Sequence, residues 1–202
     1  MADSTFPSLP SSPSSPSPPS FPVAPAEPPP QVPVDDRPVE QARFRHAFRQ
    51  VAGPVAVVLV HTPSGGVSGL TCTSAASLSG DPPMVMVAVD DRTGVAALVR
   101  EARRFSVNYL AADRAYLARA FSTGGRDLTG LAGTVRAGRT RVPTLASGTT
   151  AVLECRIADI HRGGDHWILS ATVLHARFQA DAKPLLYAAG RYGTFEPAGN
   201  PP

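Results

Sequence analysis

Residues 68–83, SGLTCTSAASLSGDPP, carry the side chains of this chain that are best suited to binding a neutral polar ligand. The stretch combines hydroxyl groups with small residues and contains no charge before Asp81. Small residues let a ligand approach the backbone, and hydroxyl groups both donate and accept hydrogen bonds. A flat heteroaromatic ring with carbonyl groups and ring nitrogens needs such neighbours. The alternative is an ordinary β-turn, in which Ser and Thr hydrogen-bond to nearby backbone groups.

Other kinds of chemistry find little support in the sequence. It contains no G-x-S-x-G segment, no H-E-x-x-H segment and no Walker lysine, so no hydrolase triad, zinc-protease site or P-loop is expected. Cys72 and Cys155 lack a metal-like spacing and are interpreted as free thiols of a cytoplasmic protein, and no metal site is predicted. The net charge of +3 comes from scattered basic residues without interleaved aromatic residues, which argues against nucleic acid as a partner.

Composition divides the chain into three parts. Residues 1–39 contain 13 of the 22 prolines, a composition that favours extended, solvated conformers and predicts a disordered tail. This tail lacks the features of a signal peptide, and no segment of the chain is long and apolar enough to span a membrane. A proline-rich docking ligand for a partner protein is the alternative. Residues 40–195 are long enough for one domain with a core, and residues 196–202 form a C-terminal tail.

Hydrophobic periodicity predicts many strands and few short helices. Phe44, Phe48 and Val51 predict an amphipathic helix over residues 39–53, and helical spacing recurs at 93–104. Strands are predicted at 55–62, 67–74, 83–90, 105–110, 149–162, 166–178 and 184–193. The Gly-rich segment 123–148 is expected to be irregular. Because regular crossover helices are missing, we predict a mainly β fold, an antiparallel barrel with short helices packed outside it.

Residues 69–90, GLTCTSAASLSGDPPMVMVAVD, resemble the flavin reductase family with the FMN-binding split barrel. The family pattern is roughly G-x-T-x-S-S-x-x-S-x-S-x-x-P-P followed by hydrophobic residues. The matching or nearly matching positions are Gly69, Thr71, Thr73, Ser74, Ser77, Ser79, Pro82 and Pro83. The resemblance continues through RFSVNYL, LECRI, GGDHWILSATV and PLLYAAGRYG, over about residues 42–193. It implies the antiparallel split β-barrel and a homodimer.

The resemblance also implies which residues bind the cofactor. The residues implied at the flavin ring and ribityl chain are Thr71, Cys72, Thr73, Ser74 and Ser77. The resemblance further implies that the turn Asp91-Arg92-Thr93 binds the flavin phosphate, through Arg92 and the start of the next helix. Asp90 and Asp91 would oppose an anion unless their side chains point away.

The hydride-donor side of the site follows from the same resemblance. His166, in the segment GDH, lines the face on which the nicotinamide stacks, and Arg191 and Tyr192 lie near the same pocket. Without the resemblance, a lone histidine at the start of a strand is more often structural than functional.

The implied function is that of an NAD(P)H:flavin oxidoreductase. Hydride passes from NADH or NADPH to FMN or FAD, and the reduced flavin diffuses to a partner monooxygenase. One alternative is a flavin-binding protein or pathway enzyme of the same fold without efficient NAD(P)H reductase activity, motivated by the segments YAAGRYG and DDRTG, where many relatives carry other residues. A further alternative is a dimeric barrel whose proline-rich tail does the binding.

Overall fold

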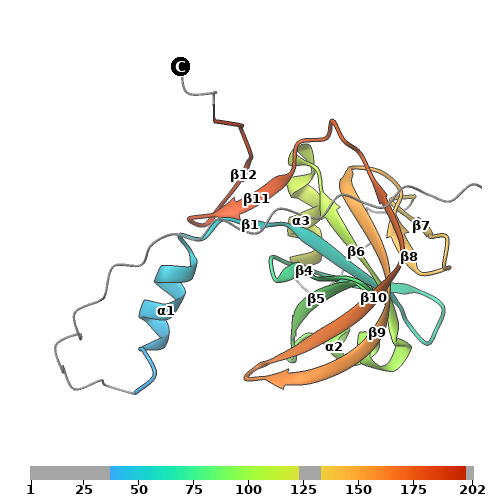
Figure 1. Ribbon diagram of the computed structural model, residues 1–202, viewed down its shortest axis with the longest axis horizontal. Coiled ribbons are helices and arrows are strands. Elements are labelled where there is room, and N and C mark those ends of the chain that lie inside the picture. The colour runs from blue at the N-terminus through green and yellow to red at the C-terminus, as the bar shows by residue number, and fades with distance from the viewer. Residues whose placement is uncertain (1–36, 123–132, 199–202) are drawn as a thin grey trace, which may run out of the picture. The chain divides into compact units, whose positions relative to one another are not determined.

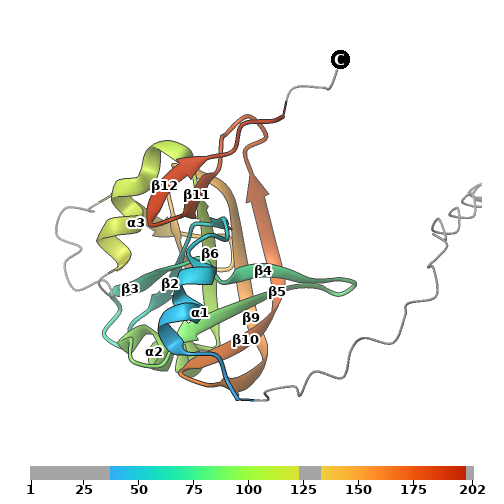
Figure 2. The same ribbon diagram turned by 90° about the vertical axis from the view of Figure 1, so that its left-hand side faces the viewer.

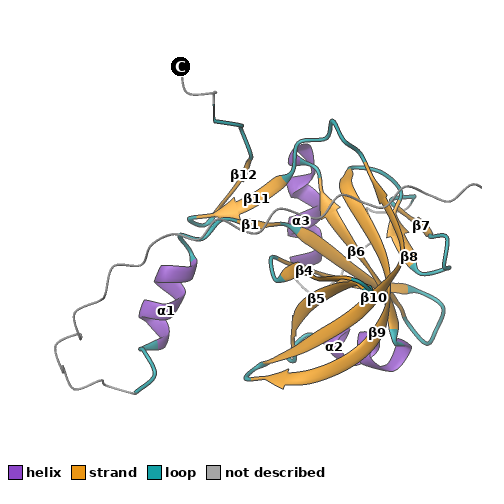
Figure 3. Ribbon diagram, in the orientation of Figure 1, coloured by secondary structure: helices purple, strands orange, loops and turns teal. Residues whose placement is uncertain are grey.

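The computed structural model describes residues 37–122 and 133–198, and these residues form a mainly β fold with short helices (Figures 1 and 3). The helices are α1 (Gln41–Phe48), α2 (Gly94–Ala102) and α3 (Ala115–Ser122), the last preceded by a 3-10 turn at Ala112–Arg114. The strands are β1 (Gly53–Pro54), β2 (Ala56–His61), β3 (Val67–Cys72), β4 (Ala75–Gly80), β5 (Pro83–Asp90), β6 (Arg104–Leu110), β7 (Val135–Ala137), β8 (Pro143–Leu145), β9 (Thr149–Gly163), β10 (His166–Phe178), β11 (Leu185–Ala188) and β12 (Arg191–Thr194).

The predicted tails fall largely outside these ranges. Residues 1–36 and 199–202 are not among the described residues, while residues 37–39 and 195–198 belong to no helix or strand. Within the described ranges, no helix is both long and apolar enough to cross a membrane.

Seven strands form one antiparallel sheet in the order β3-β2-β6-β9-β10-β5-β4. Its edge strands, β3 and β4, are consecutive in the chain, because only Thr73 and Ser74 separate Cys72 from Ala75. Three successive Cα–Cα steps span at most about 11 Å, so the sheet must curl until its two edges meet at this corner. Thr73 and Ser74, in the middle of the hydroxyl-rich stretch, therefore link the two edges of the sheet.

Strand β2 is buried on both faces and separates two hydrophobic cores. Ala56, Val58 and Val60 pack with α2 and the inner faces of β5, β6, β9 and β10. Val57 and Leu59 face the other way and pack with α3 and β8. Helices α2 and α3 lie at opposite ends of the sheet (Figures 1 and 2). The two cores pack against β3 from both sides of the sheet. They thereby also fix the position of the corner that follows β3.

The structure corrects the expectation that residues 123–148 are irregular. Residues 123–132 lie outside the described part, but β7 and β8 pair as a short hairpin within 135–145. The buried carboxylate of Glu154, on β9, accepts hydrogen bonds from the backbone N–H groups of Arg139 and Thr140 at 2.8 and 2.6 Å and from the Thr140 hydroxyl at 2.7 Å. This long-range contact organises a segment whose local sequence shows no strand pattern.

Helix α1 lies within the predicted range 39–53 but is shorter, since it ends at Phe48 and leaves Val51 outside, and it carries no buried residue. The rings of its apolar residues Phe44 and Phe48 contact each other in a tilted arrangement at a centroid distance of 4.7 Å, and both residues are at least half exposed, as are Val39 and Val51. The chain then pairs through β1 with the β11–β12 hairpin in a separate three-stranded sheet. An apolar helix face thus remains uncovered beside the corner of the main sheet.

Candidate active site at the corner between β3 and β4

Two cavities meet at the corner between β3 and β4. The larger has a volume of about 710 Å³ and is mostly apolar, with the lining residues Phe48, Val51, Ala52, Gly53, Pro54, Thr73, Ser74, Ala75, Ala76, Ser77, Met86, Ala88 and Tyr109. The smaller has a volume of about 330 Å³ and is more polar, with the lining residues Leu70, Thr71, Cys72, Thr73, Ser74, Ala88, Asp90, Thr93, Ser122 and His166. Both are lined by Thr73, Ser74 and Ala88. Volumes of this size suit a small organic ligand.

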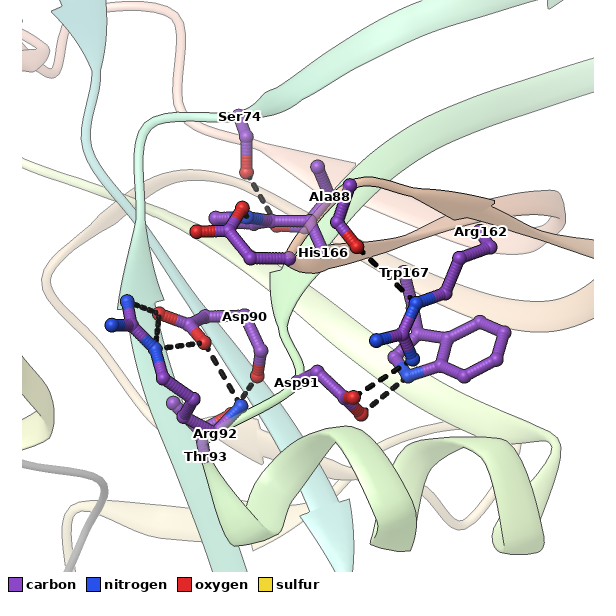
Figure 4. A network of polar contacts seen from close by, with 11 residues as sticks. Ser74, Ala88, Asp90, Asp91, Arg92, Thr93, Arg162, His166 and Trp167 are labelled. Carbon is purple, nitrogen blue, oxygen red and sulfur yellow. Dashed lines mark hydrogen bonds and ion pairs between the residues drawn. The ribbon is translucent and has the colours of Figure 1, made fainter. Parts of the chain in front are cut away.

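Some hydroxyl groups at the corner form hydrogen bonds within the protein, and one has no partner in the described part of the chain. The Ser74 hydroxyl donates to the Ala88 carbonyl at 2.7 Å and ties the corner to β5 (Figure 4). The Thr71 hydroxyl donates to the Ala118 carbonyl on α3, also at 2.7 Å. Within the described residues, the Thr73 hydroxyl is exposed and has no hydrogen-bond partner, so it is free to bond a ligand.

The larger cavity has a neutral wall. Met86 and Ala88 point into it because β5 alternates, with Val85, Val87 and Val89 buried on the opposite face. Burial raises the pKa of Tyr109 to about 12, so its phenol stays protonated near neutral pH. Burial likewise raises the pKa of the Cys72 thiol beside the smaller cavity. The site therefore presents neutral groups to a ligand along most of its length.

The charged groups gather at the turn between β5 and α2. The Asp90 carboxylate accepts from Arg92 Nε at 3.0 Å, from a terminal guanidinium nitrogen at 2.6 Å and from the Arg92 backbone N–H at 2.9 Å (Figure 4). These hydrogen bonds and the Arg92 charge lower the pKa of Asp90 to about 2. The Thr93 hydroxyl donates to the Asp90 carbonyl at 2.7 Å. The turn is closed by its own side chains.

Asp91 lines neither cavity and points toward Trp167 and Arg162 (Figure 4). Its carboxylate accepts hydrogen bonds from the Trp167 indole N–H at 2.5 Å and from Arg162 at 2.8 Å. The hydrogen bond from the indole contributes most to lowering the pKa of Asp91. The guanidinium carbons of Arg100 and Arg162 lie 3.9 and 4.8 Å from the centre of the Trp167 ring. Asp91 thus anchors the turn to β9 and β10.

His166 lines the smaller cavity at the start of β10. Its Nδ1 lies 2.7 Å from the Asp165 carboxylate, and its register partner across the sheet is Asp90. The Asp91 backbone N–H donates to the Asp165 carbonyl at 3.0 Å, which fixes the start of β10 to the turn after β5. The histidine and the charged turn therefore form one face of the cavity.

Comparison with known proteins assigns the fold that carries this site. The family model described as flavin reductase like domain matches residues 48–196. The chain belongs to this family. The reductase component of 4-nitrophenol 4-monooxygenase/4-nitrocatechol 2-monooxygenase from Rhodococcus opacus is 36% identical over 164 residues, which cover 81% of this chain and 86% of the relative. The FMN reductase (NADH) SmoA from Agrobacterium fabrum is 35% identical, over 75% of this chain and 84% of the relative.

Solved structures agree with this flavin reductase assignment. The NADH:FAD oxidoreductase SgcE6 from Streptomyces globisporus C-1027 superposes with a TM-score of 0.72 at 27% identity, over 80% of this chain and 96% of that chain.

The residues predicted for the flavin reductase site are only partly brought together. Those that line the two cavities are Thr71, Cys72, Thr73, Ser74, Ser77, Thr93 and His166. Asp91 and Arg92 belong to the adjoining turn but line neither cavity. Tyr192 packs against Tyr187 at a centroid distance of 5.3 Å and lies under Arg119, and Arg191 is exposed on the same strand, so the structure brings neither into the cavity lining.

Several lining residues of this flavin reductase were not predicted from the sequence. Phe48 ends a helix that was predicted only as amphipathic, Val51 lies just beyond that helix, and Tyr109 comes from a strand predicted without a role. Asp90 was considered only as an obstacle to an anion. The alternation of β5 carried a usable signal, because Met86, Ala88 and Asp90 share the face opposite the buried valines.

Proposed function

We propose that this flavin reductase is an NADH:flavin oxidoreductase that reduces FMN and releases the reduced flavin to a partner monooxygenase. The observation that carries the proposal is the pair of neighbouring cavities, one apolar and one polar, that share lining residues at the hydroxyl-rich corner. An apolar compartment with a neutral polar edge fits a heteroaromatic ring, and the polar compartment fits a sugar-phosphate chain. The names of the relatives, a monooxygenase reductase component and an NADH-dependent FMN reductase, support the donor and the acceptor. Bound flavin supplies the hydride-accepting chemistry.

The protein's own residues bind and orient the reactants. Thr73 and Ser74 contact the ring edge where the two cavities join, with Thr71, Cys72 and Ser77 on either side. Thr93 and the first backbone N–H groups of α2 receive the flavin phosphate, since the start of a helix favours an anion. His166 contacts the nicotinamide nucleotide from the polar cavity. The role of Arg191 and Tyr192 on the nucleotide stays a prediction.

Two structural features belong to the same proposal. The curled sheet, whose edges meet at residues 73–74, forms the split barrel of the family. A second copy of the chain covers the apolar surface formed by Phe44 and Phe48 of α1 and by Val51 just after the helix. Phe48 and Val51 also line the larger cavity, so association would shield that cavity from water. Apolar surfaces of this kind are typical of contacts between subunits.

A steady-state assay tests the proposed reaction. Purified protein is mixed with NADH or NADPH and with FMN or FAD, and oxidation of the nucleotide is followed with the appearance of reduced flavin under anaerobic conditions. We expect stoichiometric oxidation with NADH and FMN as the preferred pair. Flavin binding without nucleotide oxidation would favour the alternative, a flavin-binding protein without reductase activity.

The oligomeric state is tested separately. Light scattering after size exclusion should give the mass of a dimer for the full chain. Phe44→Glu places a charge in the exposed apolar face of α1 and should shift the protein to the mass of a monomer, whereas Arg43→Glu on the same helix should leave the dimer intact. A monomer in the unmodified protein contradicts the proposed interface.

A further inference from the structure

Asp90 projects into the polar cavity, at the place where the proposed function puts the flavin phosphate. The alternation of β5 sets this direction, since Ala88 and Asp90 share a face and both line that cavity. The side chain of Asp90 is 26% exposed, so its charge is only partly shielded by water. A carboxylate in this position faces an incoming phosphate directly.

Arg92, the cation of the turn, already forms an ion pair with the Asp90 carboxylate. The Arg92 side chain is 78% exposed, yet its guanidinium donates hydrogen bonds to both carboxylate oxygens of Asp90, at 3.0 and 2.6 Å. Asp91 cannot play the same part, because it is turned toward Trp167 and Arg162. A phosphate that approaches the turn therefore meets a neutral ion pair in place of a free cation.

We propose, on the basis of the proposed flavin reductase function, that Asp90 sets flavin selectivity by competing with the flavin phosphate for Arg92. The protein then recognises flavin through its ring and binds FMN hardly more tightly than riboflavin, which lacks the phosphate. A phosphomonoester carries about −1.5 to −2 charges near neutral pH, so repulsion by Asp90 offsets the attraction of Arg92 and of the helix start. Weak retention of the phosphate suits a flavin that must leave after reduction.

Equilibrium binding of riboflavin and FMN tests the proposal without any turnover. Binding is followed by quenching of flavin fluorescence and, independently, of the single tryptophan, Trp167. In the unmodified protein the two dissociation constants should agree within about threefold. In Asp90→Asn, FMN should bind about five- to twentyfold more tightly at low salt, the range expected for removing one charge near a partly exposed phosphate. Riboflavin binding should change less than about twofold, since it places no phosphate at the turn.

The controls separate charge from structure. Asparagine keeps an oxygen that accepts the Arg92 backbone N–H, so the turn remains closed in Asp90→Asn. Adding Arg92→Ala to Asp90→Asn should remove the gain for FMN. Asp113→Asn removes a carboxylate from the ion pair with Arg114, away from both cavities, and should change neither flavin. High salt should erase the gain, because the Debye length falls to about 3 Å at 1 M.

Each outcome decides the inference. Selective tightening of FMN supports it. An unchanged ratio of FMN to riboflavin affinity in Asp90→Asn overturns it, as does an equal loss for both flavins, which would make Asp90 a structural support of the turn. If Asp90→Asn does not fold, Asp90→Ser and the ratio of FMN to riboflavin affinity in the unmodified protein decide. FMN binding more than about tenfold tighter than riboflavin binding in the unmodified protein overturns the proposal, since tenfold corresponds to about 1.4 kcal/mol of phosphate recognition. If the unmodified protein binds neither flavin, the proposed function itself fails.

Discussion

Replacement of His166 by alanine should separate use of the nucleotide from binding of flavin. His166 lines the polar cavity and has its side chain 39% exposed. Its Nδ1 is engaged by Asp165 at 2.7 Å, which leaves Nε2 as the ring nitrogen that can reach a ligand. His166→Ala should therefore remove one hydrogen bond to the nucleotide while the flavin contacts at Thr73 and Ser74 remain.

The magnitude follows from the partial exposure of His166. A hydrogen bond to a ligand at a site that water can enter is worth about 1–2 kcal/mol, which corresponds to a loss of about 5- to 30-fold in kcat/KM for NADH. The free energy of unfolding should change little, because the side chain is not part of either hydrophobic core. A structural histidine would show the reverse pattern, with a lowered Tm and normal kinetics.

His161 offers a matched control on the same β9–β10 hairpin. Its Nε2 lies 2.9 Å from the Asp159 carboxylate, much as His166 lies against Asp165, but its side chain is 61% exposed and lines neither cavity. Both variants are compared by steady-state kinetics with NADH, by quenching of Trp167 fluorescence on flavin binding, and by thermal unfolding. A normal kcat/KM in His166→Ala, or an equal loss in His161→Ala, refutes the assignment of His166.

Three further predictions address the corner and its supports. Thr73→Trp should abolish flavin binding without lowering Tm, because the bulky ring fills the junction of the cavities from an exposed position, and fluorescence titration checks this. Gly69→Ala should lower Tm in thermal unfolding, since its Cβ would lie 2.6 Å from the Val58 carbonyl oxygen, whereas Gly80→Ala, with nothing within 4 Å, should not. Glu154→Gln should cost about 1–3 kcal/mol of stability by leaving a partly buried donor of the 139–140 segment without its acceptor. Hydrogen bonds lower the folded-state pKa of Glu154 despite burial, so its contribution is present above the unfolded pKa, and the difference from the variant should shrink as pH falls through the folded pKa.

Much of the fold follows from local patterns in the sequence. The strands at 56–61, 83–90, 104–110 and 166–178 and the helix at 94–102 lie where their periodicities predict them. Each of these elements buries a face, so its pattern of apolar residues records its environment. The mainly β class and the antiparallel pairing are likewise confirmed.

The elements that the sequence analysis missed depend on contacts between distant residues. Strand β4 is an edge strand whose outer residues are exposed, so the small hydroxyl residues that form it show no strand alternation. The β7–β8 hairpin is organised by Glu154 from β9. Such carboxylates stabilise loops only when the tertiary structure brings them within reach, and no local window contains that information.

The two neighbouring aspartates show how far the site itself could have been derived. Successive residues of a strand point to opposite faces, and this rule reaches as far as Asp90, the last residue of β5, while Asp91 already belongs to the turn. The buried face of β5 is identified by its valines, and counting from Val89 places Asp90 on the face of Ala88, toward the cavity. The sequence thus contained the direction of Asp90. It did not contain the partners of Asp91, because Trp167 and Arg162 come from strands more than 70 residues away. Asp91 is therefore anchored, and Asp90 left facing the cavity, by contacts of the turn with β9 and β10 that the alternation alone does not reveal.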